Sequence, residues 1–204
     1  MRKLPASIRL PRFHRVRPWV VIAGVALALL ATVGRQRGVP AERPVIEDDN
    51  KRYHDRSFAV VKVVDGDTLD IDIADVMHDT TRIRLWGVDT PEVAGSPRGA
   101  MYWGDRASAF AHQALDGRRV RIELVEGPTR DKYKRLLAYV YVESTGDLFN
   151  EMLLRGGHAY ADTRFPHPRS QRFVALEAEA RDSGVGLWRD VSPKQMPAWR
   201  ARRR

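Results

Sequence analysis

The stretch "VVDGDTLDIDIADV", residues 63–76, decides the fold because polar and apolar residues alternate through its second half. The alternating sets are Leu69, Ile71 and Ile73 on one side and Thr68, Asp70 and Asp72 on the other. A period of two predicts a β-strand with its apolar face in the core, and it places Asp70 and Asp72 in solvent. Asp67 has the parity of the apolar set, so its carboxylate points inward and needs a cation or hydrogen bonds.

The five aspartates of this segment do not match a calcium loop of the EF-hand type. Counted from Asp65, such a loop needs an oxygen ligand at its fifth position and glycine at its sixth, where this chain has Leu69 and Asp70. We expect Asp75 to lie in a turn, and Asp65 to support the turn that precedes the strand. Asp67 is therefore the one candidate metal ligand of the stretch.

Outward from this strand, four further runs rich in β-branched and aromatic residues also predict strands. The five expected strands cover residues 58–64, 67–74, 81–88, 118–125 and 136–142. Apolar residues at helical spacing predict three helices, namely Ala107 to Ala114, Phe149 to Gly156 with Asp147 as its cap, and Phe173 to Ala180. This order fits an α+β, mainly β, fold, a five-stranded Greek-key barrel of the OB type with three packed helices.

Composition limits the chemistry that the chain can perform. Its 204 residues suit one domain with appendages, and the absence of cysteine excludes disulfides, thiolate metal sites and a cysteine nucleophile. The net charge of +9 belongs to the two ends, because residues 1–37 carry +8, residues 189–204 carry +5, and the rest carries −4. The basic ends therefore say nothing about the substrate of the central domain, which must be inferred from its site.

The chain divides into a basic N-terminus with a hydrophobic segment (1–37), a linker (38–56), a barrel domain (57–188) and a basic tail (189–204) that we expect to be disordered. As a helix, the apolar run 19–33 spans about 22 Å, against ~30 Å for the hydrocarbon core of a bilayer. An uncleaved membrane anchor, a cleaved signal and a buried helix all fit this run. Its basic flank predicts a domain outside the cytoplasm, either anchored by the single helix or secreted.

The motif "RLWGVDTPE", residues 84–92, puts Asp89 and Glu92 around a Thr-Pro turn directly after a strand. One interpretation is a turn with solvated acids. The other is a hard-cation site shared with Asp67, because carboxylates at strand ends, a backbone carbonyl and waters suit Ca²⁺. Zinc is disfavoured, since the chain has no cysteine and no paired histidine nearby.

Arginines supply the other half of a phosphoryl-transfer site. Arg84 lies five residues before Asp89, and "RDKYKRLLAYVY" (130–141) adds the basic residues Arg130, Lys132, Lys134 and Arg135. Two guanidinium groups can bind a phosphodiester bidentately and stabilise the charge that grows in its transition state. A carboxylate such as Glu92 can deprotonate or orient the attacking water, while a metal polarises the phosphoryl oxygen.

At these motifs the sequence closely resembles the thermonuclease (staphylococcal nuclease-like) family. "VDGDT", "RLWGVDTPE" and "RDKYKRLLAYVY" occur in the family's order, followed by "FNEMLLRGGHAY" and "EAEARDSGVGLW", so the resemblance covers residues 57–188. It implies endonucleolytic hydrolysis of DNA and RNA with Ca²⁺ as cofactor, typically leaving 3′-phosphate ends.

The resemblance also implies a role for each matching residue. The implied calcium ligands are Asp67, Asp89 and the carbonyl of Thr90. The implied catalytic residues are Glu92, as general base or water-orienting group, and the phosphate-binding Arg84 and Arg135. The implied contacts to a terminal phosphate are Lys132 and Tyr133. Two positions depart from the family: Lys134 replaces its usual glycine, and no tyrosine stands near residues 163–165, where Tyr160 is the nearest substitute.

Two hypotheses follow for the function. The first is a metal-dependent phosphodiesterase, a monomeric domain whose partners are DNA and RNA, with the membrane as partner of the N-terminal segment. The alternative is a catalytically inactive OB-fold module that binds nucleic acid or protein. Such a module has no need to keep metal carboxylates, Glu92 and two arginines together. Nicking of plasmid DNA that requires Ca²⁺ and stops with EGTA separates the two.

Overall fold

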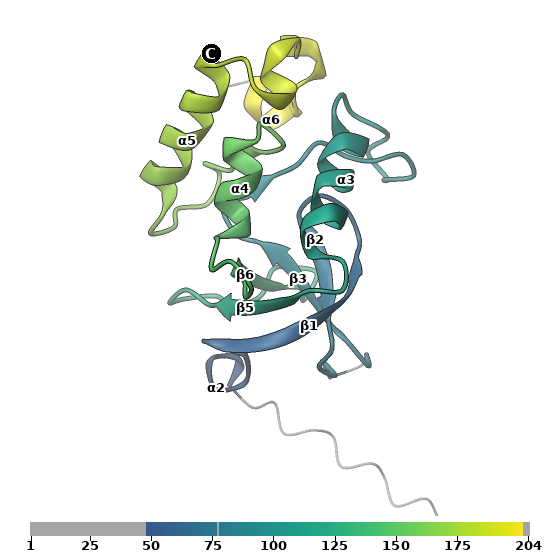
Figure 1. Cartoon of the computed structure of the whole chain (residues 1–204), viewed down its shortest axis with the longest axis vertical. Helices are drawn as coiled ribbons and strands as arrows, with labels where there is room; N and C mark the ends of the chain where they lie inside the picture. The colour runs from purple at the N-terminus through teal and green to yellow at the C-terminus, as the bar shows by residue number, and fades with distance from the viewer. Residues whose placement is uncertain (1–47, 77, 202–204) are drawn as a thin grey trace, which may run out of the picture. The chain divides into compact units, whose positions relative to one another are not determined.

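The described part of the chain is built around a closed five-stranded barrel (Figure 1). The structure is a computed structural model that describes residues 48–76 and 78–201. The strands are β1 (Arg56–Val63), β2 (Thr68–Ile71), β3 (Thr81–Leu85), β5 (Arg119–Glu123) and β6 (Leu136–Val142). They are ordered β1-β2-β3-β6-β5, and all neighbours are antiparallel except the parallel pair β3 and β6. This mixed barrel confirms the expected fold.

Three main helices pack against the barrel, as the helical spacing predicted. They are α3 (Gly104–Leu115), α4 (Phe149–Arg155) and α5 (Ser170–Asp182), and they lie at the end of the barrel opposite α2 (Figure 1). Asp147 is not the cap of α4, because the N-cap is Leu148 and no side chain caps this end. Asp147 instead belongs to the turn after β6, where its carbonyl accepts the amide of Val142 at 2.9 Å.

The alternation in β2 predicted the core side correctly and one polar residue wrongly. Leu69 and Ile71 are buried, and Asp72 is exposed. Asp70, expected in solvent, is only 6% exposed and forms a bidentate pair with Arg82, at 2.8 Å from Nε and 3.0 Å from Nη2. The two residues are cross-strand neighbours in the β2–β3 register, so the long arginine side chain covers the carboxylate.

The domain begins before the expected boundary at residue 57. The short helix α2 (Asp49–Tyr53) lies within the range assigned to the linker, and Tyr53 is fully buried with its hydroxyl 2.9 Å from Thr81 Oγ1. Arg130 fastens α2 to the barrel, because its guanidinium pairs with Asp49 at 2.8 Å and with Asp75 at 2.6 Å. Arg130 thus has a structural role, and α2 is too short for periodicity to reveal.

The C-terminal segment is ordered through Ala201, which corrects the expectation of a disordered tail. It contains the 3₁₀ helices η1 (Gly186–Arg189) and η2 (Pro193–Gln195) and the short helix α6 (Ala198–Ala201). Its apolar residues pack against a buried cluster separate from the barrel core. The cluster is Tyr160, Ala180, Leu187 and Trp188, and the residues packed on it include Val191, Met196 and Trp199. Scattered contacts of this kind have no period that a sequence pattern could reveal.

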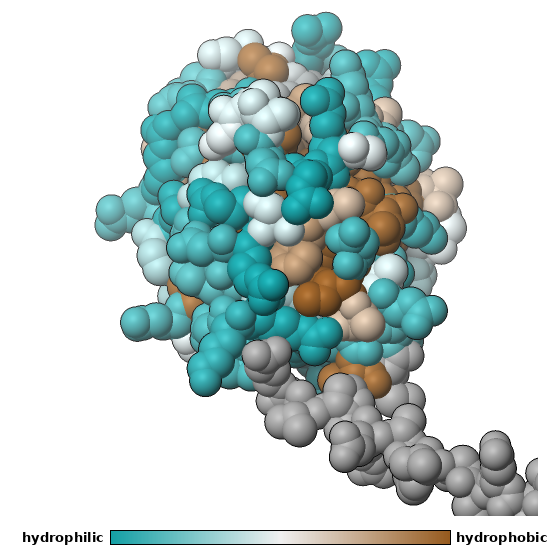
Figure 2. Space-filling view, turned by 60° about the horizontal axis from the view of Figure 1, so that its bottom comes forward, coloured by the Kyte–Doolittle hydropathy of each residue, from teal (hydrophilic) through white to brown (hydrophobic). Residues whose placement is uncertain are grey.

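The expected membrane anchor or signal, residues 19–33, lies outside the described residues. Across 48–76 and 78–201, every helix is too short or too polar to cross a bilayer. Figure 2 views the domain from the side of α2 and shows a mostly hydrophilic surface with a smaller apolar area.

Candidate active site

Arg84 contacts both carboxylates that were predicted as metal ligands, Asp67 and Asp89. Its Nη2 lies 3.1 Å from Asp67 Oδ2 and 2.8 Å from Asp89 Oδ1. Its Nη1 donates to the carbonyls of Leu85 and Val88, each at 2.7 Å. A planar guanidinium can make these four contacts at once, so the side chain is held rigidly where β3 ends.

A second small sheet carries Asp89 to this position. β4 (Val88–Asp89) pairs antiparallel with β7 (Tyr160–Ala161), and neither was separated by the strand patterns. Gly87 turns the chain between β3 and β4 with φ of +77°, a conformation that favours glycine. The carboxylate of Asp89 therefore meets Arg84 although both derive from one apparent strand in the sequence.

Asp67 is fixed by its neighbours on the other side of Arg84. Its Oδ2 accepts the amide of Thr90 at 2.8 Å and the Thr90 hydroxyl at 3.1 Å. A Cβ on Gly66 would lie 2.7 Å from Thr90 Oγ1, so only glycine allows this close approach. Asp65 supports the turn as expected, because its carboxylate accepts the amide of Asp67 at 3.0 Å.

The pair of carboxylates carries an electrostatic cost that a cation would relieve. Asp67 and Asp89 are 7% and 8% exposed. Burial raises the pKa of Asp67 and of Asp89, and Arg84 opposes this only in part. Burial alone would lower the pKa of Arg84, but the two carboxylates outweigh it and raise that pKa. Hard-cation binding by this oxygen-rich pair is thus chemically favourable.

The donor set fits Ca²⁺ only if backbone and water oxygens complete it. Within the described part of the chain, no three His, Cys, Asp or Glu side chains gather into a metal-binding group. Asp67 and Asp89 supply two carboxylates, and calcium accepts six to eight oxygen ligands, including carbonyls and waters. The residues present therefore suit a calcium ion that keeps several waters.

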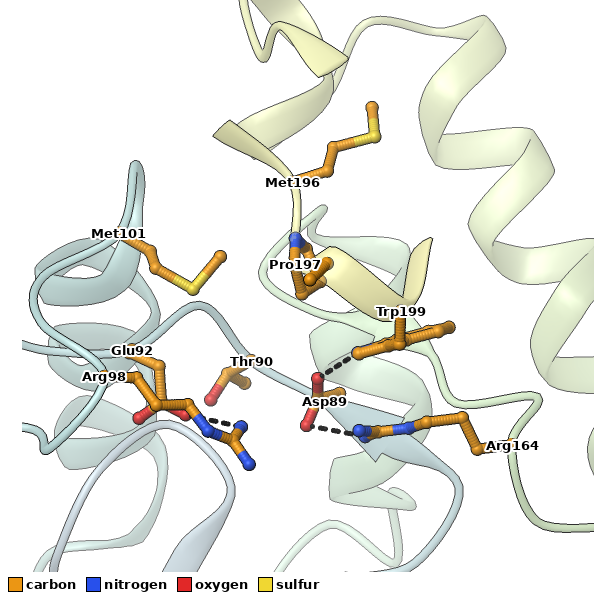
Figure 3. Close-up of a pocket in the computed structure, with 10 residues that line it drawn as sticks. Asp89, Thr90, Glu92, Arg98, Met101, Arg164, Met196, Pro197 and Trp199 are labelled. Atoms are coloured by element: carbon orange, nitrogen blue, oxygen red, sulfur yellow. Dashed lines mark hydrogen bonds and ion pairs between the residues drawn. The ribbon is translucent and has the colours of Figure 1, made fainter. Parts of the chain in front are cut away.

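Glu92 lies in a pocket of about 390 Å³ beside Asp89 (Figure 3). Its Oε1 accepts Arg98 Nη1 at 3.0 Å, and its Oε2 accepts the hydroxyl of Ser96 at 2.6 Å. A Cβ on Gly104 would lie 2.1 Å from the Glu92 carbonyl, so the start of α3 packs tightly on this turn. Glu92 is thus a held carboxylate rather than the freely solvated acid of a surface turn.

The basic loop before β6 forms a unit of its own and does not line that pocket. Arg135 pairs with Asp131 at 2.7 Å, and its guanidinium lies 5.5 Å from the ring of Tyr133. Lys132 Nζ lies 4.9 Å from the same ring, and Tyr133 is 66% exposed. Lys134 has φ of +67°, which explains why glycine suits this position.

Two residues at the site were not found by sequence reasoning. Arg164 Nη2 lies 3.2 Å from Asp89 Oδ1, and Trp199 Nε1 donates to Asp89 Oδ2 at 2.8 Å (Figure 3). Arg164 stands in the segment searched for a tyrosine, and Trp199 stands in the basic tail. Tyr160, the substitute considered there, is fully buried with its ring 5.4 Å from that of Trp188, so it belongs to the core.

The fold and site together define an OB-type barrel protein with two buried carboxylates joined by an arginine. The family model "Staphylococcal nuclease homologue" matches residues 82–190. "Endonuclease Htp3" of Saprolegnia parasitica is 31% identical over 203 residues, which cover 88% of this chain and 94% of that protein. "Thermonuclease" of Staphylococcus intermedius is 36% identical over 135 residues, 65% of this chain and 76% of that protein.

An archaeal protein matches as well. "Uncharacterized protein MJ1439" of Methanocaldococcus jannaschii is 35% identical over 160 residues, which cover 69% of this chain and 74% of that protein. The chain belongs to the staphylococcal nuclease family.

Proposed function

We propose that the chain is a Ca²⁺-dependent endonuclease that hydrolyses phosphodiester bonds of DNA and RNA by attack of water and leaves 3′-phosphate ends. One observation carries the proposal: Arg84 joins Asp67 to Asp89, and Asp89 lines a pocket that also contains Glu92. Two relatives named as a thermonuclease and an endonuclease support the same class of reaction.

The arginines are assigned to the phosphate. Two backbone carbonyls hold Nη1 of Arg84 and keep the side chain ordered, while Nη2 must exchange the carboxylates of Asp67 and Asp89 for the phosphate. Arg135 is assigned the second phosphate contact, and it must exchange its pairing with Asp131 for the substrate to be bound. Lys132 and Tyr133, exposed on the same loop, are assigned to a terminal phosphate.

The three carboxylates are assigned two roles: Asp67 and Asp89 bind the cation, and Glu92 acts on the attacking water. Asp67, Asp89 and the carbonyl of Thr90 would hold Ca²⁺, which supplies polarisation of the phosphoryl oxygen and neutralises its charge. Glu92 is assigned to deprotonate or orient the attacking water. Its hydrogen bonds from Arg98 and Ser96 orient the carboxylate. A carboxylate held in this way can accept a proton or fix a water through one hydrogen bond.

The location of the enzyme remains a proposal from the sequence. The apolar run 19–33, with its basic flank, supports a domain outside the cytoplasm, anchored by one helix or released after cleavage. Membrane fractionation of the full-length protein tests this. Resistance to a carbonate wash supports the anchor, and a mature chain that starts near residue 35 supports the signal.

The cleavage assay has three metal arms and two substrates. Full-length protein is incubated with plasmid DNA or with RNA, in Ca²⁺, in Mg²⁺ or in EGTA, and the product ends are identified by their sensitivity to a 3′-phosphatase. We expect cleavage with Ca²⁺, none with EGTA, and 3′-phosphate ends. Binding of nucleic acid without cleavage in any arm would support the alternative, a catalytically inactive OB-fold module.

A further inference from the structure

The C-terminal strap, defined as residues 192–201, reaches into the candidate active site (Figure 3). It supplies four of the residues that line the pocket, which are Met196, Pro197, Ala198 and Trp199. The opposite side of the same pocket is formed by Asp89, Thr90 and Glu92. A segment far along the chain therefore closes the space where a phosphodiester would lie.

The contact of Trp199 with Asp89 uses an oxygen that a cation would need. Trp199 Nε1 donates to Oδ2 of Asp89, while Oδ1 faces the guanidinium groups of Arg84 and Arg164. A carboxylate offers about four lone-pair positions, and three donors already surround this one. Each donor presents positive charge, so it competes with a divalent cation for the same carboxylate.

Arg164 holds the indole in this position. Its guanidinium lies 4.6 Å from the Trp199 ring, close enough for a cation–π contact. Asp162 in turn pairs with Arg164 at 2.7 Å and fixes its orientation. The indole is thus seated between a positioned arginine and the carboxylate of Asp89.

The strap packs on the domain through Met196 and Trp199, and the other described side chains of 192–200 are exposed or half-buried, which allows the strap to open locally. Its two helices are short, with three residues in η2 and four in α6. The hydrogen bonds from Ser192 to Gln195 are internal to the strap and do not attach it to the domain. Among the ion pairs of the described residues, Arg200 of the strap pairs with Glu177 outside the pocket. Glu177 is also bonded to the amide of Ala161 at 2.6 Å, so this anchor point stays fixed when Arg200 is removed. Segments with few buried contacts open at low free-energy cost.

We propose that the C-terminal strap is an autoinhibitory element that competes with the divalent cation and with the nucleic-acid strand for Asp89 and its pocket. The inference rests on the proposed nuclease function. Because a closed strap and a loaded site exclude each other, weakening the strap must raise the affinity for Ca²⁺, and Ca²⁺ must loosen the strap. The strap therefore sets the calcium concentration at which the site becomes available.

Calcium binding measured by calorimetry tests the strap without relying on activity. Four full-length proteins are compared in the absence of nucleic acid: wild type, Trp199→Phe, Arg200→Ala and the control Arg172→Ala. Trp199→Phe keeps an aromatic ring but removes the N–H donor, so we expect its Kd for Ca²⁺ to fall about tenfold, as the loss of one charged hydrogen bond predicts.

The other variants separate opening of the strap from loss of the donor. Arg200→Ala should also bind Ca²⁺ several-fold more tightly, whereas Arg172→Ala, at a surface ion pair with Glu151, should match wild type. Unchanged Kd values in Trp199→Phe and Arg200→Ala would overturn the proposal. Weaker binding would overturn it too, because Trp199 would then support the metal site.

Cleavage measured in parallel separates the two proposals. Tighter Ca²⁺ binding by the variants, with no cleavage by any of the proteins, would refute the nuclease function and leave the strap standing. Calcium-dependent cleavage by wild type with equal Kd values in every variant would refute the strap and leave the nuclease function standing.

Discussion

Replacing Arg84 by lysine removes the planar guanidinium with its several N–H donors but keeps the positive charge. Arg84 uses two nitrogens to reach four oxygens, on Asp67, Asp89, Leu85 and Val88, at 2.7–3.1 Å. A lysine has one nitrogen with three donors, so at least one buried oxygen loses its partner and the planar grip on a phosphate is lost. We expect kcat to fall about 10²–10³-fold, the usual effect of losing one transition-state donor.

The same substitution should also cost stability. Each buried carbonyl left without a donor costs about 1–3 kcal/mol, so the free energy of unfolding should fall within that range or somewhat beyond it. Single-turnover cleavage of a labelled oligonucleotide at saturating Ca²⁺ measures the chemical step, and circular dichroism verifies that the variant is folded.

Arg82→Lys is the matched control for this experiment. Arg82 lies two residues earlier on β3, its side chain is 50% exposed, and it pairs with Asp70 rather than with the site. The control should keep kcat within about twofold of wild type, because the hydrogen bonds of Arg82 go to Asp70 and not to a site residue, and lysine keeps the positive charge beside that carboxylate. A tenfold or smaller loss in Arg84→Lys would refute the assignment of Arg84 to the transition state.

Two further substitutions test the local packing and the electrostatics. Gly66→Ala puts a Cβ 2.7 Å from the Thr90 hydroxyl, so it should cost about 1–3 kcal/mol of unfolding free energy and weaken Ca²⁺ binding. Gly117→Ala, strained at φ of +66° but with open space around it, should lose stability without losing Ca²⁺ affinity, and equal affinity losses would contradict the reasoning. Asp49→Asn should destabilise the fold by about 1 kcal/mol at pH 7, because hydrogen bonds from Arg130 and Thr129 outweigh burial and lower the pKa of Asp49. That stabilisation is present above the usual pKa of 3.8 and is lost as the pH falls through the lowered value, so urea unfolding should show the difference shrinking below about pH 4. A difference that stays constant from pH 7 to pH 3 would refute this assignment.

The sequence was informative wherever one local pattern controlled the outcome. The alternation of Leu69, Asp70 and Ile71 located β2 and gave Asp67 its inward parity, because burial on one face of a strand imposes a period of two. The same alternation wrongly predicted that Asp70 is exposed to solvent, because Arg82 on the neighbouring strand covers its side chain. A pattern within one strand holds no information about what the next strand supplies.

The parts of the site that escaped prediction depend on contacts far apart in the sequence. Trp199 meets Asp89 across 110 residues, and this contact requires both the pairing of β4 with β7 and the folding back of the strap. Charge composition assigned the tail to solvent because its arginines and lysine dominate, although Met196 and Trp199 pack against the domain. The motifs predicted Asp67 and Arg84 together, because Asp67 directly precedes β2 and Arg84 lies on its barrel neighbour β3. Asp89 reaches them on β4, which belongs to the second small sheet with β7.

In the proposed nuclease, Asp67 and Asp89, joined by Arg84, form the calcium site. The most direct measurement is the rate of plasmid nicking by Asp89→Asn and Asp70→Asn as Ca²⁺ is titrated, with EGTA as the zero point. Both substitutions remove one charge from a buried, arginine-paired aspartate, and only the first lies at the site. We expect Asp89→Asn to lose calcium-dependent nicking and Asp70→Asn to keep it; equal activity of the two variants would show that Asp89 is not part of the calcium site.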